Sequence, residues 1–135
     1  MKKNFIDTNL IIYANDRRDA AKQKKAVALI ADLMRNGTGV ISTQVMQEYA
    51  SVALTKLHQR HDVVLRQLVL LEALEVVPLS PALIRRSVEL KVTYSVSFWD
   101  ASIIAAAEHA ECRRIYSEDL NTGQYYAGIT VVNPL

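Results

Sequence analysis

The fold is decided first by a short stretch of sequence, Lys3-Asn4-Phe5-Ile6-Asp7-Thr8-Asn9. Its first four residues form a short run that ends in apolar side chains, which is typical of a buried strand and too short for a buried helix. The acid, hydroxyl and amide that follow at once are residue types that favour the beginning of a helix. The stretch therefore predicts a strand over residues 3–6, with Asp7 at its carboxyl end where a helix begins.

Four further short runs are rich in β-branched residues and bounded by turn or capping residues. They predict strands at Gly39–Ser42, Leu74–Val77, Arg114–Tyr116 and Ile129–Val132. Helical patterns between them predict helices at Ala20–Arg35, Thr43–Leu57, Asp62–Ala73, Pro81–Lys91 and Phe98–Ala110. This alternation predicts an α/β fold, a three-layer α/β/α sandwich with a mainly parallel five-stranded sheet. In such folds, ligands bind beyond the carboxyl ends of the strands.

The length and composition indicate one domain that covers residues 1–135. A chain of 135 residues, of which 50% are hydrophobic, can bury a core without disulfides or metals as staples. The net charge of +2 is too small to mark a dedicated nucleic-acid binder by itself. Cys112 is the single cysteine, so an internal disulfide and a Cys-rich zinc site are excluded, and a reducing, cytoplasmic location is expected.

The sequence predicts no association with a membrane. Arg66, Glu72 and Glu75 interrupt the most apolar region, so no stretch reaches the ~18 apolar residues that a span requires. Residues 1–14 place lysines ahead of apolar residues, as a signal peptide does, but Asp7 and Asn9 fall within the would-be apolar core. We therefore expect neither a membrane span nor export.

Four carboxylates stand where the predicted fold would gather functional groups: Asp7, Glu48, Asp100 and Asp119. Three of them have a structural explanation when taken singly, because Asp7 can be an N-cap, Asp100 completes a capping box with Ser97, and Asp119 lies in a turn-forming segment. Glu48 differs because it falls on or beside the apolar stripe of its helix. An ionised carboxylate there is costly unless it pairs with an arginine or coordinates a metal.

These four carboxylates are predicted to converge on one rim of the sheet. Two of them end strands, and the other two lie in the first half of helices that start beyond strand ends. Crowded carboxylates repel each other, so such a cluster persists mainly where a cation binds. An all-oxygen ligand set suits Mg²⁺ or Mn²⁺. Zinc is not expected, because the neighbouring His58 and His61 have no evident third ligand.

The same residues, taken with their neighbours and in their order along the chain, resemble the PIN domain family, notably the VapC-type bacterial toxins and their orphan relatives. The segments that carry the resemblance are Phe5-Ile6-Asp7-Thr8-Asn9, Gln47-Glu48, Trp99-Asp100-Ala101-Ser102-Ile103 and Tyr116-Ser117-Glu118-Asp119-Leu120. Each motif is weak alone, but all four occur in the expected order, and the resemblance spans essentially the whole chain.

The resemblance implies a single-domain ribonuclease that depends on Mg²⁺ or Mn²⁺, with these acidic ligands: Asp7, Glu48, Asp100 and Asp119. It also implies that the hydroxyls of Thr8 and Ser117 lie near the metal as supporting groups. The fourth motif of the family usually reads Thr-x-Asp, and here Ser117 stands in place of the Thr. The adjacent Glu118 leaves two candidates for the acid that faces the metal.

The helical segment Asp62–Leu74 has no clean polar face, because its apolar residues outnumber Arg66, Gln67 and Glu72. Such a helix is either enclosed by its own domain or covers a second surface. We expect it to contribute to a homodimer interface, with simple burial between its neighbours as the alternative. The resemblance points to pairing as well, since VapC-type proteins commonly form dimers and, when they are toxins, bind an antitoxin protein.

Two other classes of function stay open. A Mg²⁺-dependent phosphatase or phosphoacceptor would also place an acid after its first strand, but Asp7-Thr8-Asn9 lacks the second acid of an Asp-x-Asp motif. A noncatalytic nucleic-acid-binding module could keep the same fold. Basic residues such as Arg17, Arg18 and Lys22 are candidates for RNA contacts, although solvated surface is their ordinary role. Trp99 is a candidate for stacking on a base, although an aromatic residue before an apolar helix is more often part of the core.

Overall fold

The computed structural model describes residues 2–135, and its centre is a six-stranded sheet in the order β3-β2-β1-β4-β6-β5. The strands are β1 (Lys3–Ile6), β2 (Gly39–Ser42), β3 (Glu75–Val77), β4 (Cys112–Tyr116), β5 (Tyr125–Tyr126) and β6 (Ile129–Val132). Neighbouring strands pair in parallel except β5, which pairs antiparallel with β6. The predicted three-layer sandwich with a mainly parallel sheet is confirmed.

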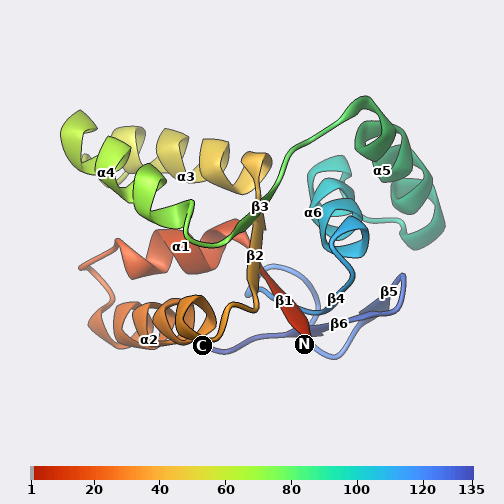
Figure 1. The fold of residues 1–135 in the computed structure, drawn as a ribbon, viewed down its shortest axis with the longest axis horizontal. Coiled ribbons are helices and arrows are strands. Elements are labelled where there is room, and N and C mark those ends of the chain that lie inside the picture. The colour runs from red at the N-terminus through yellow and green to blue at the C-terminus, as the bar shows by residue number, and fades with distance from the viewer. Residues whose placement is uncertain (1) are drawn as a thin grey trace.

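Helices cover both faces of this sheet (Figure 1). On one side lie α1 (Thr8–Ala14), α2 (Ala20–Asn36), α3 (Thr43–Thr55) and α4 (His61–Leu71), and on the other lie α5 (Pro81–Tyr94) and α6 (Phe98–His109). The segment after Asp7 forms a helix of its own, α1, with Asp7 as the N-cap. The connection from α2 to β2 turns at Gly37, which ends α2 in the left-handed conformation with φ +70°.

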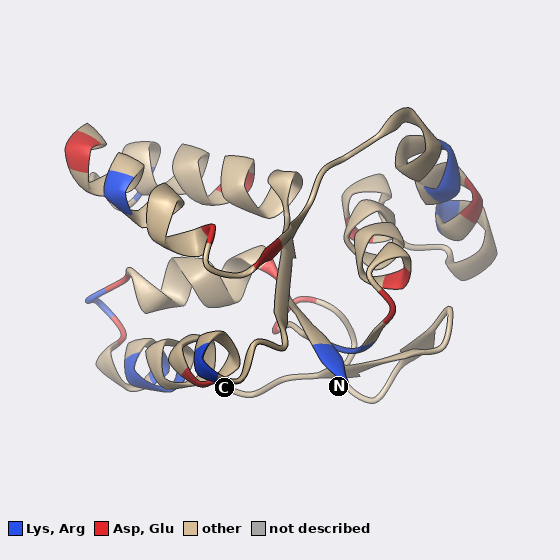
Figure 2. Ribbon diagram, in the orientation of Figure 1, with Lys and Arg blue, Asp and Glu red and all other residues tan. Residues whose placement is uncertain are grey.

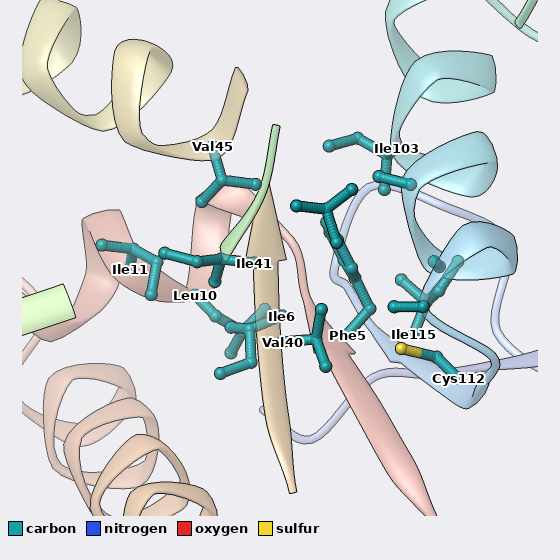
Figure 3. Packing of buried hydrophobic residues seen from close by; sticks show 14 of the residues in the cluster. Phe5, Ile6, Leu10, Ile11, Val40, Ile41, Val45, Ile103, Cys112 and Ile115 are labelled. Atoms are coloured by element: carbon teal, nitrogen blue, oxygen red, sulfur yellow. The ribbon is translucent and has the colours of Figure 1, made fainter. Parts of the chain in front are cut away.

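Both faces of the central strands are buried, which explains why their sequences read as nearly continuous apolar runs. Phe5 and Val40 pair across β1 and β2 and point toward α6, whereas the next residues, Ile6 and Ile41, point toward α1 (Figure 3). Each of these four side chains is at most 1% exposed. The rim of β1 is therefore held in place by packing from two sides.

Two details of the fold differ from the sequence prediction. The sheet has six strands where five were predicted, because β5 contains only Tyr125–Tyr126 and a two-residue strand carries no periodic signal. The alternative that α4 is simply enclosed by its own domain is wrong, since Leu65 and Val69 are 60% and 66% exposed. Within residues 2–135, no helix is long and apolar enough to cross a membrane.

Candidate metal centre

Asp7 lies at the carboxyl end of β1, directly beside the end of β4. Its backbone N–H donates to the carbonyl of Tyr116 at 2.9 Å, which continues the ladder between the two strands. The Asp7 carboxylate accepts the backbone N–H of Thr8 at 2.7 Å and the hydroxyl of Ser117 at 2.7 Å. Because the start of α1 and the residue after β4 both donate hydrogen bonds to it, this carboxylate is fixed in position.

The Asp7 carboxylate is buried without a positive partner. Only 6% of the residue is exposed, and among residues 2–135 no Lys or Arg forms an ion pair with it. Burial raises the pKa of Asp7 to about 6, the charges of Asp119 and Glu48 add to the rise, and the hydrogen bonds from Ser117 and Thr8 oppose it. A bound cation would relieve this unfavourable burial of charge.

Ser117 organises the loop that follows β4. Its hydroxyl donates to Asp7 and accepts the backbone N–H groups of Asp119 and Leu120, both at 3.1 Å. The side chain of Ser117 is fully buried, and Leu120 anchors the loop in the core. Asp119 is thereby held near Asp7 while its own side chain stays exposed.

Glu118, the acid beside Asp119, is occupied elsewhere. Its carboxylate accepts a 2.7 Å hydrogen bond from Lys22 Nζ and a 2.8 Å hydrogen bond from the hydroxyl of Tyr13. These two donors hold the pKa of Glu118 below its usual value, Lys22 having the larger effect. Of the two adjacent acids, Asp119 is the one whose charge acts on Asp7 and Asp100.

Glu48 is exposed, so of the two predicted positions, on or beside the apolar stripe of α3, it occupies the second. The helix turns its apolar stripe, with Val45 and Tyr49, into the core, and Glu48 lies beside that stripe on the solvent side. Its carboxylate accepts a 2.9 Å hydrogen bond from Gln44 Nε2, and its charge raises the pKa of Asp7. Glu48 is therefore at the rim of the site, although burial does not put it there.

Asp100 lies in the first turn of α6. The Ser97 hydroxyl accepts the Asp100 backbone N–H at 3.0 Å, so the predicted capping role of Ser97 is present. Asp100 is half-buried, and burial raises its pKa, with a further contribution from the charge of Asp119. Asp119 therefore couples electrostatically to both Asp7 and Asp100.

The four carboxylates share one neighbourhood but do not close on one point. Among residues 2–135, no group of three or more Asp, Glu, His or Cys side chains is close enough to hold a single metal ion. Glu48 and Asp119 are exposed, so rotation of their side chains needs no change in the core.

A second observation fits a divalent cation near Asp7. The hydroxyl oxygen of Thr8 is buried with no hydrogen-bond partner among the described residues, and buried polar groups without partners are rare. It follows Asp7 directly in the chain and adds a neutral oxygen to the carboxylates. Oxygen ligands of this kind are those that Mg²⁺ and Mn²⁺ prefer.

Two site residues were not assigned a role from the sequence. Asn9 accepts the Glu118 backbone N–H at 3.1 Å and places its amide nitrogen 3.5 Å from both Asp7 Oδ2 and Ser117 Oγ. Gln44 is 4% exposed and joins Glu48 to the carbonyl of Trp99 at the start of α6, at 3.2 Å. In the sequence, the only signal for this role of Gln44 was an amide residue one helical turn before Glu48.

A family model confirms the resemblance that these motifs predicted. The PIN domain model matches residues 5–127, which is most of the chain. The chain belongs to the PIN domain family. Among curated protein sequences, none matches this PIN domain significantly.

Solved structures show the same fold. The PIN domain is similar to VapC20 from Mycobacterium tuberculosis, a toxin that cleaves the sarcin-ricin loop, with a TM-score of 0.72, 21% identity, and coverage of 87% of this chain and 90% of that one. A toxin–antitoxin complex from Klebsiella pneumoniae is similar with a TM-score of 0.73, 23% identity and 98% coverage of both chains. DNA-bound VapBC from Salmonella typhimurium is similar with a TM-score of 0.73, 15% identity and 100% coverage of both chains.

Proposed function

We propose that this PIN domain is a Mg²⁺- or Mn²⁺-dependent endoribonuclease. One observation carries the proposal, namely the buried Asp7 carboxylate that no described Lys or Arg neutralises, with the charges of Asp119 and Glu48 acting on it. A buried carboxylate that serves only the fold is normally paired with a basic side chain. A buried carboxylate without such a partner at the carboxyl end of a strand therefore supports a cation-binding role.

In this proposal, Asp7 is the central ligand because its position is fixed by Thr8 and Ser117. Asp119 and Asp100 hold the cation directly or through water, and Glu48 orients the attacking water from the start of α3. A cation held by these residues would supply charge neutralisation at the scissile phosphate and activation of a water. The chain supplies the fixed carboxylates, so little reorganisation is needed at the moment of reaction.

We also propose that the protein is the toxin of a toxin–antitoxin pair in the cytoplasm. Support comes from the similar structures, since VapC20 is a toxin and the Klebsiella structure is a toxin–antitoxin complex. A single buried thiol, Cys112, fits a reducing compartment.

A homodimer is the second assembly that we propose. Leu65, Val69 and Leu70 leave α4 with an apolar solvent face, and each is more than half exposed. Contiguous apolar surface of this kind marks an interaction site in soluble proteins.

A nuclease assay on mixed RNAs tests the activity. We expect cleavage with Mg²⁺ or Mn²⁺, none with EDTA, and none by Asp7→Asn or Asp100→Asn at any metal concentration. Asp32→Asn is the matched control, because Asp32 is an exposed acid on α2 that pairs only with Arg35 among the described residues. It should cleave as wild type does.

The same assay separates the two other classes. RNA binding without turnover in any metal would replace the nuclease by a noncatalytic binding module. Stable phosphorylation of Asp7 by a small phosphodonor, with no RNA cleavage, would replace it by a phosphoacceptor or phosphatase.

A further inference from the structure

Two hollows that share a wall lie beside the acidic site. The smaller hollow, of about 280 Å³, is lined by Asn9, Glu118 and Asp119 at its acidic end. The larger hollow, of about 690 Å³, opens between the α1–α2 connection and the α3–α4 connection. Asp16, Arg18 and Lys56 line both, so the two hollows form one groove that leads away from the acids. We call this the basic groove.

Positive charge is concentrated in the larger hollow of the basic groove, whereas Glu118 and Asp119 make the smaller hollow acidic. The larger hollow is lined by four Arg or Lys side chains, Arg17, Arg18, Lys56 and Arg60, against one carboxylate, Asp16. That local excess of three exceeds the net charge of +2 for the whole chain. Figure 2 shows the blue segment of the α1–α2 connection on the left of the view, with a red segment on each side of it.

Among the described residues, two of the cations that line the groove form ion pairs with carboxylates, and two do not. Arg18 donates through its backbone N–H, Nε and Nη2 to the buried Asp16 carboxylate, at 3.0, 2.9 and 2.9 Å, which fixes the guanidinium where the two hollows meet. Arg60 pairs with Asp62 at 3.1 Å. Arg17 and Lys56 are exposed and make no ion pair with any residue from 2 to 135. These two are free to bind an anion.

The floor of the groove is fixed by hydrogen bonds between its two walls. Gln59 accepts from the hydroxyl of the fully buried Tyr49 at 2.8 Å and donates to Asn15 Oδ1 at 3.2 Å. Asn15 in turn donates to the carbonyl of Ile11 at 2.9 Å. The α3–α4 connection also bends through His58, which takes φ +52° without being glycine. Such strained backbone tends to persist at binding sites, where the surroundings enforce it.

The start of α4 adds the positive end of a helix dipole, which Asp62 in the first turn partly offsets. Its N-cap, Arg60, makes no side-chain cap hydrogen bond, so the first amide groups of a helix of 11 residues have no side-chain acceptor. Arg60 and Val63 both line the larger hollow. A helix N-terminus among cations favours anionic ligands.

We propose that the basic groove binds the phosphodiester backbone of single-stranded RNA on one side of the cleavage point. This inference rests on the proposed function, because it takes the scissile phosphate to lie at the acids. Arg17 and Lys56 contact phosphates in the larger hollow, and Arg18 contacts the phosphate between the two hollows. The contacts are to the backbone, so they set affinity and register without reading the base sequence.

Charge and position favour RNA over an acidic peptide as the occupant. The hollow that Asp119 lines shares Arg18 and Lys56 with the larger, cation-rich hollow, which matches a polymer whose charges repeat along its length. A short acidic peptide would match the cations but would not explain why the groove continues to a carboxylate.

The test compares two double variants with the same change of charge. Arg17→Gln/Lys56→Gln removes the free cations of the groove. Lys24→Gln/Arg85→Gln removes one Lys and one Arg that are exposed on α2 and α5, outside the groove. Binding of a fluorescent single-stranded RNA oligomer is measured in EDTA over a series of salt concentrations, and a denaturing gel confirms that the RNA stays intact.

We expect the groove variant to bind roughly tenfold more weakly at 0.1 M salt. The slope of log K against log salt should fall in magnitude by about 1.4, since each phosphate contact to a single strand contributes about 0.7. The control variant should match wild type in both quantities. In metal, the groove variant should show a raised KM for a long RNA.

Four results would overturn the proposal: wild-type RNA affinity and slope in the groove variant, an equal loss in the control variant, no RNA binding by wild type, or groove-dependent binding of poly-glutamate in place of RNA. A failure of the proposed nuclease activity can be distinguished from a failure of the groove proposal. If wild type binds RNA through Arg17 and Lys56 but cleaves none in Mg²⁺ or Mn²⁺, the groove is supported and only hydrolysis is lost.

Discussion

The hydroxyl of Ser117 donates a 2.7 Å hydrogen bond to the carboxylate of Asp7, a residue 110 positions earlier in the chain. The bond exists because β1 and β4 are parallel neighbours, with Ile6 opposite Tyr116, so that the next residue of each strand emerges at the same edge. The same hydroxyl accepts two backbone N–H groups of the loop that carries Asp119. One side chain therefore ties the central acid to the loop of a second acid.

Ser117→Ala should lower both stability and RNA cleavage. The change leaves the backbone N–H groups of Asp119 and Leu120 without an acceptor and removes a donor from a buried carboxylate, which costs about 1–3 kcal/mol of unfolding free energy. Urea denaturation measures the loss. Ser117→Thr, which keeps the hydroxyl, should retain most of both properties, and the exposed Ser51→Ala on α3 should change neither. Full cleavage by Ser117→Ala would contradict a positioning role.

Asp7→Asn should raise thermal stability in EDTA at neutral pH. The folded-state pKa of Asp7 is about 6, above the ordinary value of 3.8. Its protonated form therefore stabilises the fold fully below pH 3.8, and that contribution is lost as the pH rises through 6. Linkage gives a cost of about 3 kcal/mol at pH 8, which the neutral amide avoids.

Thermal melts of Asp7→Asn and wild type between pH 3.5 and pH 8 measure this difference. The two proteins should converge at the acid end and separate at the alkaline end, where Mn²⁺ should stabilise only wild type. A variant that melts well below wild type at pH 8 would show that Asp7 is needed for the fold and not for a cation.

Glu118→Gln and Asp119→Asn should have opposite outcomes. Glu118 is held by Lys22 and Tyr13, so its loss should leave cleavage within about twofold of wild type and cost at most ~1 kcal/mol, as for a partly exposed ion pair. Asp119→Asn should abolish cleavage. Initial rates with saturating Mg²⁺ distinguish them, and the reverse ranking would make Glu118 the acid that faces the metal.

Leu65→Glu/Val69→Glu should convert a dimer to a monomer. Both side chains are on the exposed apolar face of α4, so a charge there disrupts association without disturbing the core. Light scattering across a dilution series measures the change, with the exposed Ala28→Glu on α2 as the control. A wild-type protein that is monomeric at every concentration would remove the homodimer proposal.

The sequence by itself determined the class of fold, and it predicted four acids as metal ligands. Strand runs such as Gly39–Ser42 are buried on both faces and remain apolar throughout, so the pattern is visible locally. Local chemistry also fixed Ser97 as an N-cap and Gly37 as the end of α2. The strand β5 was not predicted, because two residues are too few to show an alternation of apolar and polar side chains.

Only the tertiary structure decided which groups act on one another. Lys22 and Glu118 are 96 residues apart, and no local signal shows that their ion pair leaves Asp119 as the acid near Asp7. Spacing alone placed Glu48 on or beside the apolar stripe, and the packing of α3 against the sheet decides on which side of the edge of that stripe the residue falls. The basic groove arises from two connections, at Arg17 and Lys56, that are brought together because α1 and α3 pack side by side. Sequence periodicity reports the burial of each element, whereas charges from distant segments meet only when those elements pack.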